Sequence, residues 1–343
     1  MRVCPTAEMT CFSFLTNPDF PVLRLPRLLS SLLLLLFAGP FPLTAESPPG
    51  AIWPDVLAAL EVTMPYLPDG PEVLARERTR TSEAIAGARD EEEERALIEA
   101  FFTRLGLSHF SLQPRHPGDA GAPNDFSAEL SEPIGHLPAL PAQLEISRPR
   151  PEVLVLRFNY FMPNLMERLR EAILGHAHPE HLIIFDLRDN PGGLAVMANG
   201  LAGLLTTEPF SLGTMTMPDT VLHQRVFPQP GAHTGPVVIF LNQGTASTGE
   251  LFAAGLQEQS RALVIGETSA GAVLPSFLRE VGEGRFILQY PVADFVTPGG
   301  VRLEGRGVIP DLAVALDGED PERETAHLQD LALEAFGRIL SAR

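Results

Sequence analysis

The chain has 343 residues, 45% of them hydrophobic, so it is long enough to bury a sizeable core in one large or two ordinary domains. Its 43 acidic residues face 25 basic ones, and the formal charge of −18 should repel nucleic acid and anionic membranes. All 25 basic residues are arginine, since the sequence contains no lysine. This excludes a Ser–Lys dyad, Schiff-base chemistry and a P-loop.

The first 45 residues are typical of a secretory signal peptide. Arg24 and Arg27 precede the apolar run LLLLLFAG, and the stretch ends at the small residue Ala45. The run is short for a membrane span. We therefore expect 1–45 to be cleaved from a secreted or periplasmic protein, with an uncleaved signal anchor as the alternative and no other membrane partner.

Metal and cofactor sites find little support in the sequence. Both cysteines, Cys4 and Cys11, precede the expected cleavage point, so the mature chain would have no disulfide and no thiolate ligand. The histidine-rich stretch HAHPEH (176–181) does not match the spacing of a standard zinc motif. It also falls in a loop at the opposite end of the predicted sheet from the other polar junctions. We expect no metal and no cofactor.

The region after the signal divides into helices and a linker. Apolar residues recur at helical spacing over 51–105, with an acidic opposite face, and Gly106 is expected to end the last helix. We therefore expect an N-terminal helical region over 46–112. Residues 113–150 are rich in proline and glycine, which predicts a linker or extended loop, with a short strand within it as the alternative.

From residue 151 onward, near-continuous apolar strands alternate with helices. The predicted strands are 152–161, 181–190, 236–242, 261–267 and 286–298, and the predicted helices are 164–176, 192–205, 248–259 and 322–340. This alternation predicts an α/β layered fold with a largely parallel sheet. We assign 151–343 to one domain that closes with a C-terminal helix.

Two strand-to-helix junctions carry small polar residues where α/β proteins place their reactive groups. They are FDLRDNPGG (185–193) and FLNQGTASTGE (240–250). A nucleophilic serine needs a tight turn, small neighbours and nearby backbone N–H groups, all of which surround Ser247. The alternative is that Ser247 or Thr248 merely caps a helix and that the glycines merely turn the chain.

A nucleophilic serine needs a base, and without lysine the natural candidate is histidine. The chain has nine histidines. His109, in LGLSHFSL, lies where the helical region gives way to a short apolar stretch. Taken alone, a histidine in such a place is more often an ordinary half-buried residue.

Taken together, these stretches resemble the C-terminal-processing (tail-specific) serine peptidases, in the branch of the tricorn protease core and the interphotoreceptor retinoid-binding proteins. The matching segments are IIFDLRDNPGG, VVIFLNQGTASTGELFAAGLQE, RALVIGETSAGAVLPS and TPGGVRLEGRGVIPDLAV, in the family's order. The resemblance covers roughly residues 97–112 and 151–316. It implies a crotonase- or ClpP-like core of ββα-type units and a serine endopeptidase activity on polypeptides.

The resemblance also implies the catalytic residues. Processing peptidases place a lysine about where this chain has Ala272, so a Ser–Lys mechanism is lost. The tricorn-like branch uses serine and histidine, completed by a carboxylate. On that pattern Ser247 is the nucleophile, His109 the base and Glu304 the orienting carboxylate, with Ser108 assisting.

The oxyanion hole implied by the resemblance consists of backbone N–H groups. Gly193 and Thr248 are the expected donors, and Gly192 is the second candidate for the glycine position. Many relatives insert a PDZ domain after the histidine segment, but about 40 residues separate His109 from Val153, too few for such a domain. Recognition of substrate C-termini through a PDZ domain is therefore not expected.

Two rival functions remain open at this stage. A catalytically silent family member would keep the fold and bind peptides or apolar ligands without cleaving them. An esterase would use the same groups on small esters, although GTASTG is not the GxSxG elbow of that class. The natural substrate and the oligomeric state do not follow from the sequence.

Overall fold

The computed structural model describes residues 50–63, 70–115 and 141–341, all within the unit that begins at Glu46. The expected signal peptide over 1–45 and most of the expected linker lie outside these residues. Among the described helices, none combines the length and the apolar character needed to cross a membrane.

The core is a six-stranded sheet with the order β12-β8-β7-β4-β3-β2. Its strands are β2 (Leu144–Arg150), β3 (Val153–Phe158), β4 (Leu182–Asp186), β7 (Val237–Leu241), β8 (Leu263–Gly266) and β12 (Leu312–Ala313). All neighbours pair in parallel except β2 and β3, which are antiparallel. Every residue of β4 and β7 is buried, which explains their continuous apolar sequences.

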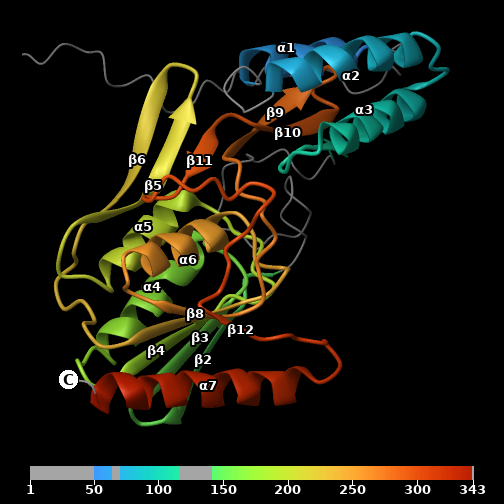
Figure 1. Ribbon diagram of the computed structural model, residues 1–343. Coiled ribbons are helices and arrows are strands. Elements are labelled where there is room, and N and C mark those ends of the chain that lie inside the picture. Colours follow the sequence, from blue (N-terminus) through green and yellow to red (C-terminus); the bar gives the residue numbers. More distant parts are fainter. Residues whose placement is uncertain (1–49, 64–69, 116–140, 342–343) are drawn as a thin grey trace, which may run out of the picture. The chain divides into compact units, whose positions relative to one another are not determined.

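Helices cover both faces of this sheet (Figure 1). One face packs against α4 (Pro163–Leu174), α5 (Ala195–Gly203) and α6 (Thr248–Glu258), and the other against α7 (Pro321–Ser341). Alternate residues of β3 serve the two layers: Leu154 belongs to the first core, while Val155 lies in the second core with Leu328 of α7. The expected α/β core with a C-terminal helix is confirmed.

Two small antiparallel sheets flank the core. The first has the order β11-β5-β6, with β5 (Phe210–Met217), β6 (Thr220–Val226) and β11 (Asp294–Val296). The second has the order β1-β10-β9, with β1 (Ser111–Pro114), β9 (Ser276–Val281) and β10 (Phe286–Pro291). In the second sheet, β1 pairs with β10, although the two strands lie far apart in the sequence.

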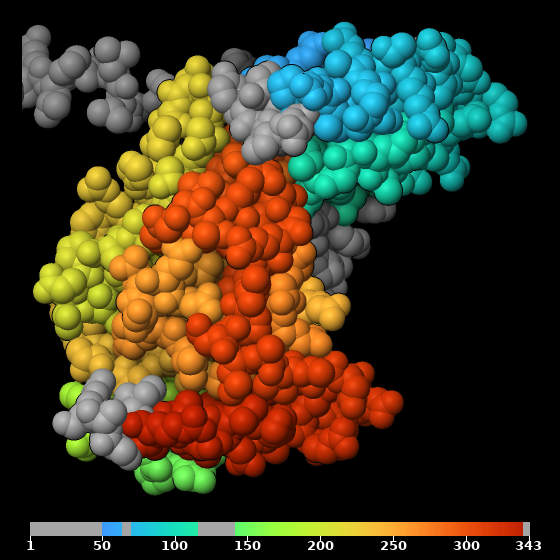
Figure 2. Space-filling view, in the orientation of Figure 1, coloured from blue at the N-terminus to red at the C-terminus, as the bar shows by residue number. Residues whose placement is uncertain are grey.

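The N-terminal region is helical, as expected. It comprises α1 (Trp53–Thr63), α2 (Gly70–Ile85) and α3 (Glu91–Leu105), whose surfaces are blue to blue-green in Figure 2. Asp90 caps α3 at its start, and Gly106 ends it in a left-handed conformation with φ 66°. The apolar faces of these helices form a separate core with Leu112 of β1 and Leu288 of β10.

Two expectations about elements need correction. The hairpin β5–β6 was not expected, because β5 is largely half-buried, β6 is mostly exposed, and neither has a continuous apolar run. The single strand expected over 286–298 is two strands, β10 and β11, which belong to different sheets. The expected linker over 113–150 contains β2, the short strand for which that expectation left room, and this strand forms one edge of the core sheet.

Candidate active site

The two polar junctions lie side by side because β4 and β7 are parallel neighbours. The carboxyl ends of parallel strands meet at one edge of the sheet, so the loops that follow them also meet. The Ala246 N–H donates to the Asn190 carbonyl at 2.9 Å, and Thr245 Oγ1 donates to the Leu187 carbonyl at 2.7 Å. These bonds clamp the loop that carries Ser247 to the loop that carries the glycines.

Ser247 occupies a strained turn between β7 and α6. Its φ of 53° and ψ of −120° are unusual for a residue with a side chain. The Ser247 N–H is shared between the Ala272 carbonyl at 2.8 Å and Glu250 Oε2 at 3.0 Å. Gly192 packs against this turn so closely that a Cβ there would lie 2.7 Å from Ser247 Cβ, so the glycine is required.

His109 approaches Ser247 from the N-terminal region. It follows the end of α3, has φ 62° and is only 7% exposed. Its Nε2 lies 3.1 Å from Ser247 Oγ, and its Nδ1 lies 2.7 Å from Ser108 Oγ. The histidine is therefore bracketed by two hydroxyl groups that are separated by 139 positions in the sequence.

Glu304 completes the line on the far side of Ser108. Its Oε2 accepts the Ser108 hydroxyl at 2.9 Å, and its Oε1 accepts the Ser108 N–H at 2.7 Å. The Val273 N–H also donates to Oε2, at 2.9 Å. The structure thus brings Ser247, His109, Ser108 and Glu304 into one continuous hydrogen-bonded chain.

The three candidate oxyanion donors differ in their present bonding. The Gly192 N–H already donates to Asn190 Oδ1 at 2.9 Å. No described residue accepts a hydrogen bond from the N–H of Gly193 or of Thr248, at the first residue of α6. Thr248 Oγ1 donates to the Gly193 carbonyl at 2.7 Å, which holds these two residues together. The geometry favours Gly193 over Gly192.

Glu250 is a site residue that the sequence reasoning missed. Its side chain is fully buried and accepts Ser269 Oγ at 2.6 Å, the Gly271 N–H at 2.7 Å and the Ala272 N–H at 2.9 Å, in addition to the Ser247 N–H. Burial raises the pKa of Glu250, and these hydrogen bonds partly oppose that shift. The spacing of a serine followed three residues later by glutamate, which is typical of a capping box, could have identified it.

The histidine-rich stretch lies far from this chemistry, at the amino end of β4. The rings of His176 and His181 are 4.5 Å apart, and that of His178 lies 4.8 Å from His181. In the part of the chain that the structure describes, no group of three or more histidine, cysteine or acidic side chains could hold a metal ion.

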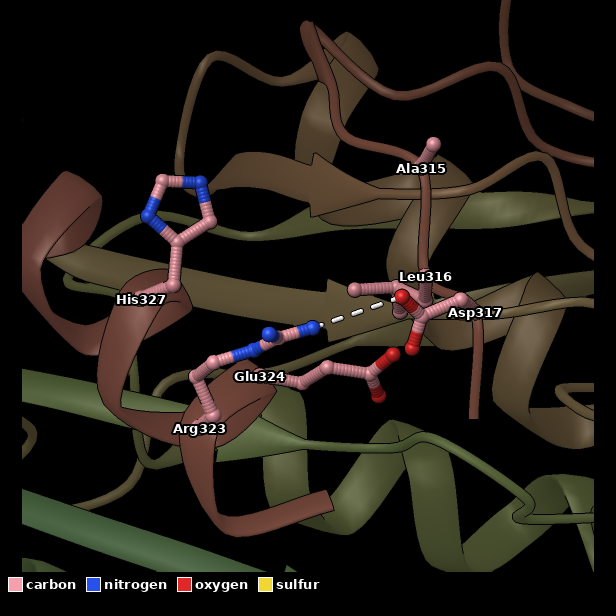
Figure 3. A pocket seen from close by; sticks show the side chains of 6 residues that line it. All are labelled: Ala315, Leu316, Asp317, Arg323, Glu324 and His327. Carbon is pink, nitrogen blue, oxygen red and sulfur yellow. Dashed lines mark hydrogen bonds and ion pairs between the residues drawn. The ribbon is translucent and has the colours of Figure 1, made fainter. Parts of the chain in front are cut away.

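Two surface hollows differ in their relation to the candidate residues. A hollow of about 270 Å³ lies beside the start of α7, where Arg323 pairs with Asp317 at 3.4 Å (Figure 3). None of its lining residues belongs to the candidate site. A larger hollow, of about 410 Å³, is lined by Phe110 and Ser111, which directly follow His109.

Comparison with known proteins points to a peptidase family. The profile of Peptidase family S41 matches residues 152–314. The carboxyl-terminal-processing protease of Synechocystis is 33% identical over 197 residues, which are 56% of this chain and 44% of that protein. The chain therefore spans less than half the length of this relative.

Two solved structures share the fold. A lipoprotein structure from Streptococcus agalactiae gives a TM-score of 0.59 at 15% identity and covers 85% of this chain and 98% of that one. A structure from Parabacteroides merdae, described as that of a peptidase, gives a TM-score of 0.55 at 16% identity. The match covers 80% of this chain and 93% of that one. At these identities the likeness concerns the fold alone.

Proposed function

Because residues 152–314 match the profile of Peptidase family S41, we propose that this chain is a serine endopeptidase that cleaves polypeptides through an acyl-enzyme. One observation carries the proposal: the unbroken line of hydrogen bonds from Ser247 Oγ through His109 and Ser108 to Glu304. A helix cap would need Ser247 alone. A nucleophile needs a base within hydrogen-bond reach and a group that orients the base.

The hydrogen-bond line supports one direction of proton transfer. If His109 Nε2 accepts the Ser247 hydroxyl, its Nδ1–H donates to Ser108 Oγ, and the Ser108 hydroxyl donates to Glu304. Ser247 Oγ then attacks the peptide carbonyl while His109 takes its proton, and His109 later passes that proton to the leaving amine. Through Ser108, the Glu304 carboxylate favours the positive charge that develops on the imidazole.

The negative charge of the tetrahedral intermediate needs donors close to Ser247. We assign this role to the N–H groups of Gly193 and Thr248, which no described residue uses. The amino end of α6 adds a favourable dipole at the same place. Removal of one such donor typically costs about 3 kcal/mol of transition-state stabilisation.

Polypeptides outside the cytoplasm are the proposed substrates. The hydrophobic N-terminal stretch ending at Ala45 supports a secreted or periplasmic location. Lysine is absent and the base is a histidine, so the mechanism differs from a Ser–Lys dyad. Water takes the place of the leaving amine in the second half of the reaction and releases the acyl group from Ser247.

Covalent labelling tests this proposal. A fluorophosphonate should react with Ser247, and mass mapping should locate the adduct on that residue. Ser247→Ala should abolish both labelling and casein cleavage without lowering the midpoint of thermal unfolding. Full cleavage of casein by Ser247→Ala would refute the mechanism, whereas peptide binding without any labelling would indicate a silent binding protein.

A further inference from the structure

We propose that the outer edge of β9 (Ser276–Val281) binds an extended segment of the substrate as an added strand. The inference rests on the proposed function and concerns how that site recognises a polypeptide. In the sheet β1-β10-β9, β9 is an edge strand that pairs only with β10 among the described strands. An exposed edge of this kind can accept an extended peptide through main-chain hydrogen bonds.

The alternation of hydrogen bonds across the sheet identifies which backbone groups of β9 point outward at that edge. The Val292 N–H donates to the Pro275 carbonyl at 2.8 Å, just before β9 begins. In an antiparallel ladder the bonded pairs alternate, so Phe277 and Arg279 bond to β10 as well. Ser276, Leu278 and Glu280 therefore direct their N–H and C=O groups away from β10.

A hydrogen bond between β1 and β10 leads to the same assignment of inward and outward groups. The Arg115 N–H donates to the Arg285 carbonyl at 2.7 Å. Odd-numbered residues of β10, such as Ile287, therefore bond to β1, which leaves even-numbered ones, such as Leu288, for β9. Two independent bonds thus agree that the outward groups of β9 belong to its even-numbered residues.

The edge begins next to the nucleophile. The Ala272 carbonyl accepts the Ser247 N–H, and the Val273 N–H donates to Glu304. From Ala272 the chain reaches Ser276 in four residues and Leu278 in six, which is at most about 13 and 20 Å at about 3.3 Å per residue. A peptide whose scissile carbonyl sits at Ser247 can therefore reach the edge within about six residues.

The edge is chemically suited to varied sequences. Main-chain hydrogen bonds do not depend on the side chains of the peptide, so they select extended and unfolded polypeptides as a class. Phe277 is 56% exposed and offers an apolar surface beside the same edge. This mode needs no carboxyl terminus, and it suits internal segments of a chain.

The test measures peptide binding in a Ser247→Ala background, so that cleavage does not interfere. The probe is a fluorescein-labelled decapeptide of alternating valine and serine, and anisotropy gives its Kd. Leu278→Pro removes one outward N–H that β10 does not use, and edge strands tolerate proline at such positions. We expect Leu278→Pro to weaken binding about fivefold, which is the contribution of one hydrogen bond.

Leu278→Ala is the matched control, because it truncates the same side chain but keeps the N–H, and it should stay within about twofold of the parent. Circular dichroism melts check that both variants fold. Equal binding by Leu278→Pro and its parent would overturn the inference, as would a parent that does not bind the decapeptide. If the Ser247→Ala variants bind in this pattern but the unmutated chain, with Ser247 intact, never reacts with a fluorophosphonate, the proposed function is refuted and the added strand still stands.

Discussion

At the scale of single residues, the two groups that meet at the site are both held in unusual backbone conformations. Ser247 has φ 53° and His109 has φ 62°. Such conformations cost about 1–3 kcal/mol each and persist only where the surroundings hold them. Here the surroundings are explicit: the shared N–H bond of Ser247, and the bond of Ser108 to Glu304 directly before the histidine.

Glu250 is the residue whose replacement tests this support. Glu250→Gln puts an NH₂ group against backbone N–H donors that now meet a carboxylate. We expect the rate of fluorophosphonate labelling at Ser247 to fall at least tenfold, because the turn loses its anchor and a buried donor is left unpaired. Labelling kinetics followed by intact-mass spectrometry measure this.

The control for that substitution lies on the same helix. Glu258→Gln, two turns further along α6, alters a carboxylate that accepts Thr297 Oγ1 and the Gly299 N–H away from the site. Its labelling rate should match that of the parent. If both variants lose the same fraction of the labelling rate, the effect of Glu250→Gln is a general weakening of α6.

At the scale of elements, the two ends of the parallel sheet have different roles. The carboxyl ends of β4 and β7 carry the candidate site, whereas their amino ends carry buried histidines. His233, just before β7, is fully buried, and its Nε2 donates to the Pro236 carbonyl at 3.2 Å. Burial lowers the pKa of His233 to about 4, and burial also lowers the pKa of the neighbouring His176.

These histidines should make the fold sensitive to acid. The unfolded chain binds a proton at His233 near pH 6.5, but the folded chain does so only near pH 4. Stability therefore falls as the pH drops through that window, by up to about 3 kcal/mol for this residue. Urea unfolding at pH 7.5 and at pH 4.5 measures the loss.

The variant His233→Gln keeps a donor for the Pro236 carbonyl but cannot be protonated, so it should lose less stability between the two pH values. The exposed His327 provides the control, since His327→Gln should show the acid sensitivity of the parent. If His233→Gln and the parent lose the same free energy of unfolding, the acid sensitivity arises elsewhere.

At the scale of the whole molecule, the site joins segments that are distant in the sequence. Ser108 and Glu304 are 196 residues apart, and His109 and Ser247 are 138 apart. The N-terminal helical region therefore supplies Ser108 and His109, and the core supplies Ser247 and Glu304. Neither region contains the complete hydrogen-bonded line.

A double-mutant cycle should show whether Ser108 and Glu304 act through one hydrogen-bonded path to His109. Ser108→Ala and Glu304→Gln each interrupt the same path between the carboxylate and His109, so each should lower kcat by about tenfold or more. Because groups that act as a unit are not additive, the double variant should lose no more than the worse single one. Fully multiplicative losses, measured on one peptide substrate, would show that the two residues act separately.

Much of the fold could be predicted because its signals are local. The continuous apolar strands before Asp186 and Asn242, and the glycine cap at Gly106, depend only on nearby residues. The hairpin over 210–226 could not be predicted, because one strand is half-buried, the other is mostly exposed, and neither shows a clear apolar period. The split of 286–298 also escaped prediction, since an alternating pattern does not specify which sheet a strand joins.

For the candidate site, too, some features follow from the sequence and others only from the tertiary structure. By itself the sequence determined which chemistry is open to this chain: it has no lysine, and it places a serine in a small-residue turn between a strand and a helix. Only the tertiary structure decided that His109 lies 3.1 Å from Ser247 and that Glu250 is buried beneath the turn. The sequence specifies residue types and local patterns. Distances between segments that are remote in the sequence depend on how those segments pack against one another, so only the tertiary structure shows them.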